Sequence, residues 1–64
     1  MDNDKMIKIV LARKALCQAA EGNITKKERM AFREAARKLE KIERMFPDEA
    51  DEAITAIAGL ENIG

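Results

Sequence analysis

The sequence contains no histidine, tryptophan, tyrosine or serine, and its one cysteine is Cys17. Histidine is the usual proton carrier near neutral pH, and a nucleophilic triad needs a nucleophile beside a base. Zinc sites need several cysteine or histidine ligands, and a single thiol cannot close an internal disulfide. We therefore expect a protein that is not an enzyme, with no catalytic residue, no cofactor and no metal.

Long hydrophobic runs and an excess of charge of one sign are also missing. The 64 residues include 12 Lys and Arg against 12 Asp and Glu, and no apolar run approaches the length of about 18 residues that a membrane span needs. Lys8, Arg13 and Lys14 interrupt the apolar N-terminal stretch, which argues against a secretory signal. With 47% hydrophobic residues and no net charge, the composition favours a folded chain. We expect one domain over residues 1–64 that is cytoplasmic, in agreement with the lone thiol, and binds no membrane.

Glycine and proline are scarce, and their positions divide the chain into three parts. Gly22 follows an alanine-rich segment, Pro47 follows a charged segment, and Gly59 and Gly64 lie near the end. Both residue types interrupt regular helices, so these positions predict helix boundaries. We predict three helices at roughly 4–21, 26–46 and 49–60 with short connections. The expected fold class is all-α: an antiparallel hairpin of helices 1 and 2 with a short third helix.

The second segment has the most specific pattern. Thr25 and Glu28 have the spacing of a capping box, in which each side chain accepts a hydrogen bond from the backbone amide of the other residue. Pro47 lacks an amide hydrogen and disfavours helical geometry at the preceding residue, so the helix should end there. Between these signals, apolar residues recur at alternating spacings of three and four, which predicts an apolar seam. The seam consists of Phe32, Ala35, Leu39, Ile42 and Phe46.

The third segment begins with acidic residues and continues with an apolar stripe. Asp48 suits the N-cap position, and the carboxylates that follow it match the positive end of the helix dipole. A calcium site is the alternative, but the glycine-centred loop of such sites is missing. The stripe consists of Ala50, Ala53, Ile54, Ile57 and Leu60.

The first segment is apolar around almost its whole circumference. Met6–Leu11 could form a strand from its β-branched content, but Ala12–Glu21 strongly favours a helix that ends at Gly22. A helix without a wide polar face is expected to be buried on more than one side, with Met6 and Cys17 inside. Three short helices offer few partners for such a helix, so we expect a homo-oligomer, most simply a dimer. The predicted self-association residues are Ile9, Leu16, Phe32, Leu39, Ile42 and Phe46.

The charges are distributed unevenly along the chain, although they sum to zero. Residues 26–44 hold eight Lys or Arg and four Glu, whereas residues 45–64 hold five acidic residues and no basic one. On a helical wheel, basic side chains of the second helix gather beside the apolar seam, and like charges follow one another at i+4, which is unfavourable in an isolated helix. We call this set the basic ridge: Arg29, Arg33, Arg37, Lys41 and Arg44.

Three explanations would compensate for the repulsion within the basic ridge. The acidic start of the third helix, from the same chain or from another subunit, could lie across the ridge, or water could solvate the ridge. A protein partner with an acidic patch could bind it, or it could bind nucleic acid or a nucleotide. Met30 and Met45 lie on the polar side of the same helix, where flexible thioethers suit a contact surface. The predicted partner-binding residues are Arg29, Met30, Arg33, Arg37, Lys41, Arg44 and Met45.

These observations favour a non-enzymatic protein–protein interaction module. It would act on another protein as an inhibitor, an adaptor or an accessory subunit, of the kind that phages and other mobile elements encode. The alternative is a homo-oligomer that binds nucleic acid or a nucleotide through the basic ridge. A pI near 6.2 and the presence of only two aromatic residues argue against that alternative. A helix-turn-helix is disfavoured, since the second helix is too long for a recognition helix and begins with Lys26 and Lys27 instead of base-reading side chains. A ribbon-helix-helix is disfavoured because a strand that begins at Met6 leaves little room for a full first helix before Gly22.

Overall fold

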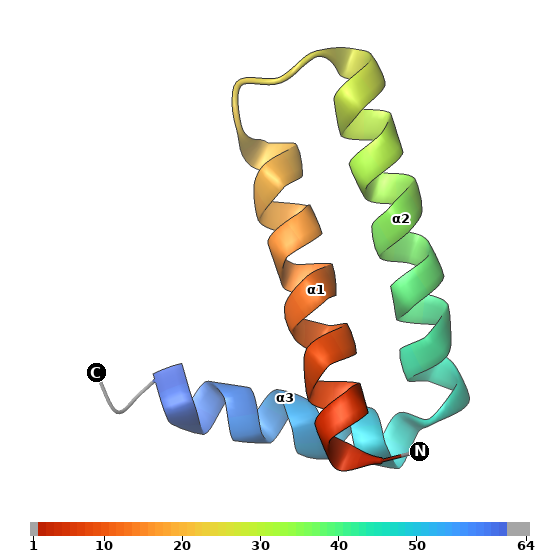
Figure 1. The fold of residues 1–64 in the computed structure, drawn as a ribbon, viewed down its shortest axis with the longest axis vertical. Helices are drawn as coiled ribbons and strands as arrows, with labels where there is room; N and C mark the ends of the chain where they lie inside the picture. The colour runs from red at the N-terminus through yellow and green to blue at the C-terminus, as the bar shows by residue number, and fades with distance from the viewer. Residues whose placement is uncertain (1, 62–64) are drawn as a thin grey trace.

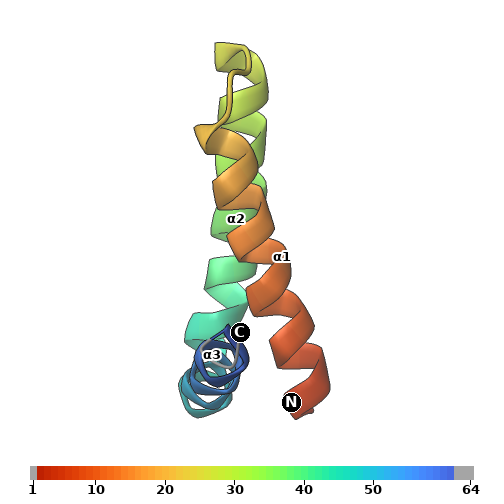
Figure 2. The same ribbon diagram turned by 90° about the vertical axis from the view of Figure 1, so that its left-hand side faces the viewer.

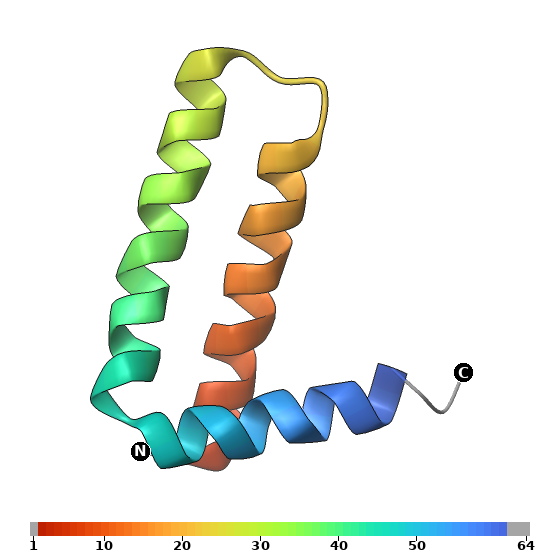
Figure 3. The same cartoon turned by 180° about the vertical axis from the view of Figure 1, so that it is seen from behind.

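The computed structural model describes residues 2–61, which form three helices: α1 (Asn3–Glu21), α2 (Lys26–Met45) and α3 (Pro47–Glu61). α1 and α2 run antiparallel as a hairpin, and α3 crosses the open end of that hairpin at a steep angle (Figure 1). Seen from behind, α3 passes in front of α1, so it lies on one face of the hairpin (Figure 3). The predicted all-α fold with a helical hairpin is confirmed, and Met6–Leu11 is helical.

Side-chain caps fix where the first two helices begin. Asp2 caps α1, and its carboxylate accepts a hydrogen bond from the Asp4 amide at 3.3 Å. At the start of α2, the Glu28 amide donates to the Thr25 hydroxyl and the Thr25 amide donates to the Glu28 carboxylate, both at 3.1 Å. The predicted capping box is confirmed, and it fixes the start of α2, with four residues between the two helices.

The junction between α2 and α3 differs from the prediction by one or two residues. α2 ends at Met45, Phe46 leaves helical geometry with φ −132° and ψ 67°, and α3 begins at Pro47. The prediction that Asp48 is the N-cap was wrong, because Asp48 lies in the first turn of α3. Proline is tolerated at the first helical position because its missing amide hydrogen would have no intrahelical partner there. Asp48 and Glu49 still match the helix dipole.

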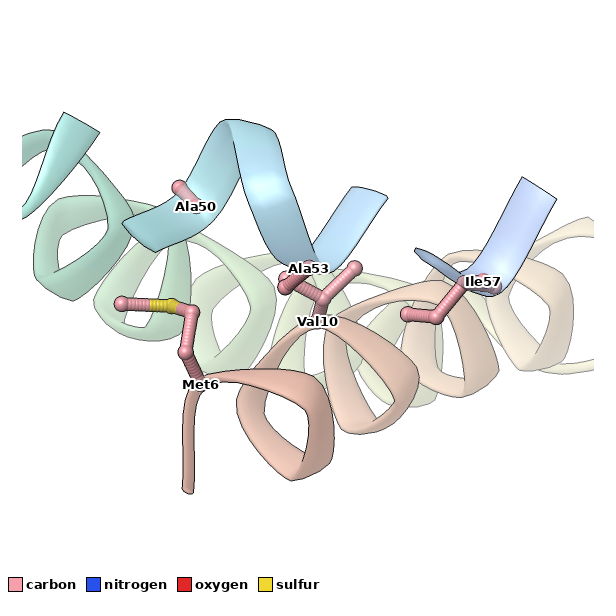
Figure 4. Close-up of a cluster of buried hydrophobic side chains, with 5 residues drawn as sticks. All are labelled: Met6, Val10, Ala50, Ala53 and Ile57. Atoms are coloured by element: carbon pink, nitrogen blue, oxygen red, sulfur yellow. The ribbon is translucent and has the colours of Figure 1, made fainter. Parts of the chain in front are cut away.

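A small apolar cluster between α1 and α3 forms the core at the open end of the hairpin. Met6 and Val10 of α1 are fully buried against three residues of α3 (Figure 4). Those residues share one face of α3, and two of them are small enough to let the helices approach closely. The three are Ala50, Ala53 and Ile57. The core therefore uses few large side chains and involves only the first half of α1.

Beyond the reach of α3, the hairpin is one layer thick. The principal extents of the molecule are 34 × 31 × 13 Å, and Figure 2 shows no third helix against the upper halves of α1 and α2. The prediction that Cys17 is buried was wrong, because its side chain is exposed. The last described residue of α3, Glu61, contacts Lys14, which lies about one turn of α1 short of Cys17.

Candidate interaction surface on α2

One row of α2 faces α1, and it is not the predicted seam. Ala36 and Glu43 are the buried residues of α2, and Arg29 lies one heptad before Ala36 in the same row. The seam residues Phe32, Ala35, Leu39 and Ile42 are only half-buried. The seam is therefore rotated away from the contact with α1. Ala20 and Ala36 are small and buried, which allows the two helices to approach along this row.

An ion pair joins the middle of α1 to the last turn of α2. The Arg13 guanidinium Nε donates a hydrogen bond to the Glu43 carboxylate. Only 9% of the Glu43 side chain and 24% of the Arg13 side chain is exposed, so this pair is shielded from water far more than an ordinary surface pair. The hydrogen bond to Glu43 raises the pKa of Arg13. Sequence reasoning missed this pair, although an arginine inside an apolar segment and a glutamate following Ile42 were its available signals.

The outer members of the basic ridge have partners within the chain. The Arg29 Nε donates to the Ala20 carbonyl at 3.0 Å, so Arg29 satisfies one of the carbonyls left over at the end of α1. Arg44 pairs with Glu40 at 3.2 Å on the exposed surface of α2. Both residues are therefore partly committed to the fold.

The middle of the basic ridge is unpaired within the described chain. Arg33, Arg37 and Lys41 are exposed, and none of them forms an ion pair or a side-chain hydrogen bond with any residue from 2 to 61. Three consecutive i+4 cations thus repel one another without compensation.

A shallow hollow lies along this part of α2. It has a volume of about 250 Å³ and is lined by Met30, Arg33, Glu34 and Arg37. Three of these four residues belong to the predicted partner-binding set. Met30 is 62% exposed and Met45 is 65% exposed, as their positions on the polar side of the helix predict. Met45 lies four turns further along α2 and does not line the hollow. The hollow offers an apolar thioether flanked by two guanidinium groups and one carboxylate.

The acidic start of α3 does not neutralise the basic ridge. Within residues 2–61, the only ion pair of α3 joins Glu61 to Lys14 of α1, at 3.5 Å. Asp48, Glu49, Asp51 and Glu52 form none. Of the explanations for the ridge, an intramolecular contact with α3 is therefore absent from the described chain, and solvation, the α3 of another subunit or a foreign partner remains.

Between residues 2 and 61, no three Asp, Glu or Cys side chains are grouped so that they could hold a metal ion. None of the three helices combines the length and apolarity that crossing a bilayer demands.

The comparisons with known proteins found no match. The sequence fits no protein-family model, and neither a curated protein nor a solved structure is significantly similar to it.

Proposed function

We propose that this chain is a non-enzymatic protein-binding module that acts on another protein as an inhibitor, an adaptor or an accessory subunit. Its contact surface is the hollow at Met30 together with Arg33, Arg37 and Lys41. The observation that supports this proposal is the combination of an exposed apolar side chain with unpaired guanidinium groups in one depression. Arginine and methionine are both enriched at protein interfaces, where arginine binds carboxylates through two parallel hydrogen bonds.

The chemistry of the hollow defines the kind of partner. An acidic surface would supply carboxylates for Arg33 and Arg37, and an apolar side chain of the partner would pack against Met30. Contacts of this type are strongest when water is excluded from around the apolar centre. The partner is therefore a protein surface with one apolar residue between acidic residues.

Nucleic acid is the alternative ligand, and Glu34 argues against it. The Glu34 carboxylate lines the same hollow as Arg33 and Arg37 and would repel a phosphate group placed there. A protein partner, by contrast, can donate a hydrogen bond to this carboxylate. Nucleic-acid surfaces also use exposed aromatic side chains for stacking, and Phe32 and Phe46 are both half-buried away from the hollow.

The experiment is an affinity capture from a native lysate by tagged protein, with and without nuclease, read by mass spectrometry. The double variant Arg33→Glu/Arg37→Glu should lose the captured protein while the helical circular dichroism spectrum and the thermal midpoint stay close to wild type. The matched control is Lys27→Glu/Lys38→Glu, which makes the same charge change at exposed positions of α2 outside the hollow. This control should keep the captured protein.

Three outcomes would contradict the proposal. If the captured material disappears on nuclease treatment and its affinity falls steeply with salt, the surface binds nucleic acid. If both double variants lose the partner equally, general charge and not the hollow is responsible. If Arg33→Glu/Arg37→Glu unfolds the chain, the ridge has a structural role.

A further inference from the structure

The face of the hairpin opposite α3 is covered by no other part of the described chain. On α1, Met6 and Val10 turn toward α3, while Leu16 lies about 100° around the helix on the other flank. In an antiparallel pair of right-handed helices, this side of the hairpin, on which Leu16 of α1 lies, also carries most of the predicted seam of α2. This is the face turned toward the viewer in Figure 1, where α3 passes behind α1. We call it the open face: Ala12, Leu16, Ala19, Phe32, Ala35, Leu39 and Ile42.

The large side chains of the open face are outside the core cluster. Ile9 and Phe46 pack against the edge of that cluster, so they already have partners within the chain. Leu16, Phe32, Leu39 and Ile42 do not belong to it and are half-buried. Each of them is partly exposed, and α3 lies on the other face of the hairpin. Four large apolar side chains therefore share one incompletely covered face.

The exposed area of the chain is larger than a compact monomer of this mass would have. Its accessible surface is 5018 Å², whereas the usual scaling for 7.2 kDa gives roughly 4,100 Å². The radius of gyration of 12.7 Å likewise exceeds the value of about 10.7 Å expected for 64 residues. The excess of roughly 900 Å² is close to the ~800 Å² that each partner buries in a stable protein–protein interface. This excess is spread over the molecule, and the exposed Ile54 and Leu60 of α3 contribute to it as well as the open face.

The distribution of side-chain size on the open face suits a second copy of the same chain. Its large residues come mainly from α2, whereas α1 contributes the small side chains of Ala12 and Ala19. A two-fold axis parallel to the helices lays α2 of each copy over α1 of the other. Large residues then pack against small ones on both sides of the axis. A surface that is complementary to itself in this way needs no foreign partner.

We propose that two copies of this chain pack through their open faces into a symmetric four-helix bundle, with the two α3 helices outside. In this bundle, the second copy covers the face of the hairpin that α3 does not reach. The basic ridge stays exposed, because Arg37 lies about 140° around α2 from Ile42. The dimer thus presents two copies of the proposed protein-binding surface, and self-association and partner binding use different faces.

The experiment is sedimentation equilibrium of the full chain over a hundredfold range of concentration that extends to tens of micromolar. The wild type should show twice the chain mass, with a thermal midpoint that rises with concentration. Ala12→Glu and Ala19→Glu are tested separately, since both alanines are exposed and tolerate a larger side chain in the monomer. Each places two carboxylates in the apolar interface, one from each copy, and should weaken self-association at least about 100-fold.

The matched control is Ala56→Glu, the same substitution at an exposed position of α3. It should leave the two-chain mass unchanged, and so should Arg33→Glu/Arg37→Glu. A wild type of one-chain mass at tens of micromolar would overturn the proposal. A two-chain mass that survives both Ala12→Glu and Ala19→Glu, or that is lost only with the ridge variant, would overturn the choice of face. None of these outcomes depends on whether a foreign partner binds the ridge.

Discussion

The ion pair between Arg13 and Glu43 leads to a quantitative prediction about the stability of the hairpin. Replacing Arg13 by Met keeps most of the side-chain volume but leaves the Glu43 carboxylate, only 9% exposed, without its cation. Fully buried pairs lose about 3–5 kcal/mol when one partner is removed, and exposed pairs lose about 0–1 kcal/mol. Because Arg13 is 24% exposed, an intermediate loss of about 2 kcal/mol is expected. For a domain of this size, such a loss lowers the thermal midpoint by about 8–16 °C.

The reverse substitution should cost less. Glu43→Leu leaves a guanidinium at the end of a long flexible side chain that already reaches solvent, so Arg13 can turn its charge to water. We expect a loss of about 1 kcal/mol for this variant. The double variant Arg13→Met/Glu43→Leu should lie within about 1 kcal/mol of wild type, since apolar residues of similar size often replace a buried pair without loss.

Urea and thermal unfolding followed by circular dichroism would measure all four proteins at one fixed chain concentration. With these losses the double-mutant cycle should give a coupling energy of about 2–4 kcal/mol. Moderate salt should reduce this coupling only in part, because a shielded pair is screened less than an exposed one. Additive single losses, or a loss below about 0.5 kcal/mol for Arg13→Met, would show that the pair behaves like a surface pair and does not hold α1 to α2.

Two further predictions concern the helix ends. Thr25→Ala should destabilise the protein by about 1 kcal/mol, because the hydroxyl that accepts from the Glu28 amide is lost. Hydrogen bonds from Thr25, its hydroxyl first and its amide second, hold the pKa of the Glu28 carboxyl below its usual value. The stability from the ionised Glu28 is therefore present above its unfolded pKa and disappears as the pH falls through the lower, folded pKa. Urea unfolding should show a larger difference between wild type and Thr25→Ala at pH 7 than below pH 4, and an equal difference at both would contradict a hydrogen bond from the Thr25 hydroxyl to the Glu28 carboxylate. Gly59→Ala should stabilise α3 by about 0.5–1 kcal/mol, since an added Cβ at Gly59 meets no atom within 4 Å and glycine is a poor residue inside a helix. A lower midpoint in thermal unfolding would contradict the exposed position of Gly59.

Much of the fold was predictable because local signals and tertiary packing agree. The capping box at Thr25 and Glu28 fixes the start of α2 through its own hydrogen bonds, independent of the rest of the chain. Pro47 ends α2 for an equally local reason, although the same proline also starts α3. The N-cap prediction for Asp48 failed because sequence alone does not tell a proline that follows a helix from one that opens the next.

The packing face of α2 was harder to predict. Hydrophobic periodicity identified the apolar seam with Phe32 and Leu39, but it did not identify the residues that α2 buries, which are Ala36 and Glu43. Alanine contributes little to a hydrophobic pattern, and a glutamate counts against burial, yet close approach and the pair with Arg13 decide the contact. The prediction that Cys17 is buried failed for another reason. Its burial depends on how far α3 extends along α1, and no local sequence pattern encodes that length.

The candidate surface was predictable in composition but not in detail. The i+4 spacing of Arg33, Arg37 and Lys41 identifies an unusual run of like charge from the sequence alone. That Arg29 would instead bond to the Ala20 carbonyl depends on the hairpin connection and could not be deduced from spacing. The place of Glu34 beside Met30, by contrast, follows from their i+4 spacing on one helix.

Site-specific photo-crosslinking in the native cell would test the protein-binding surface most directly. A photo-reactive aromatic amino acid at position 30 lies in the hollow, and the same amino acid at position 55 lies on the exposed side of α3 as a control. We predict that position 30 forms a covalent adduct with one foreign protein and that position 55 does not. Adducts with nucleic acid, adducts from position 55 alone, or no foreign adduct at position 30 would contradict the proposal that this face of α2 binds a protein.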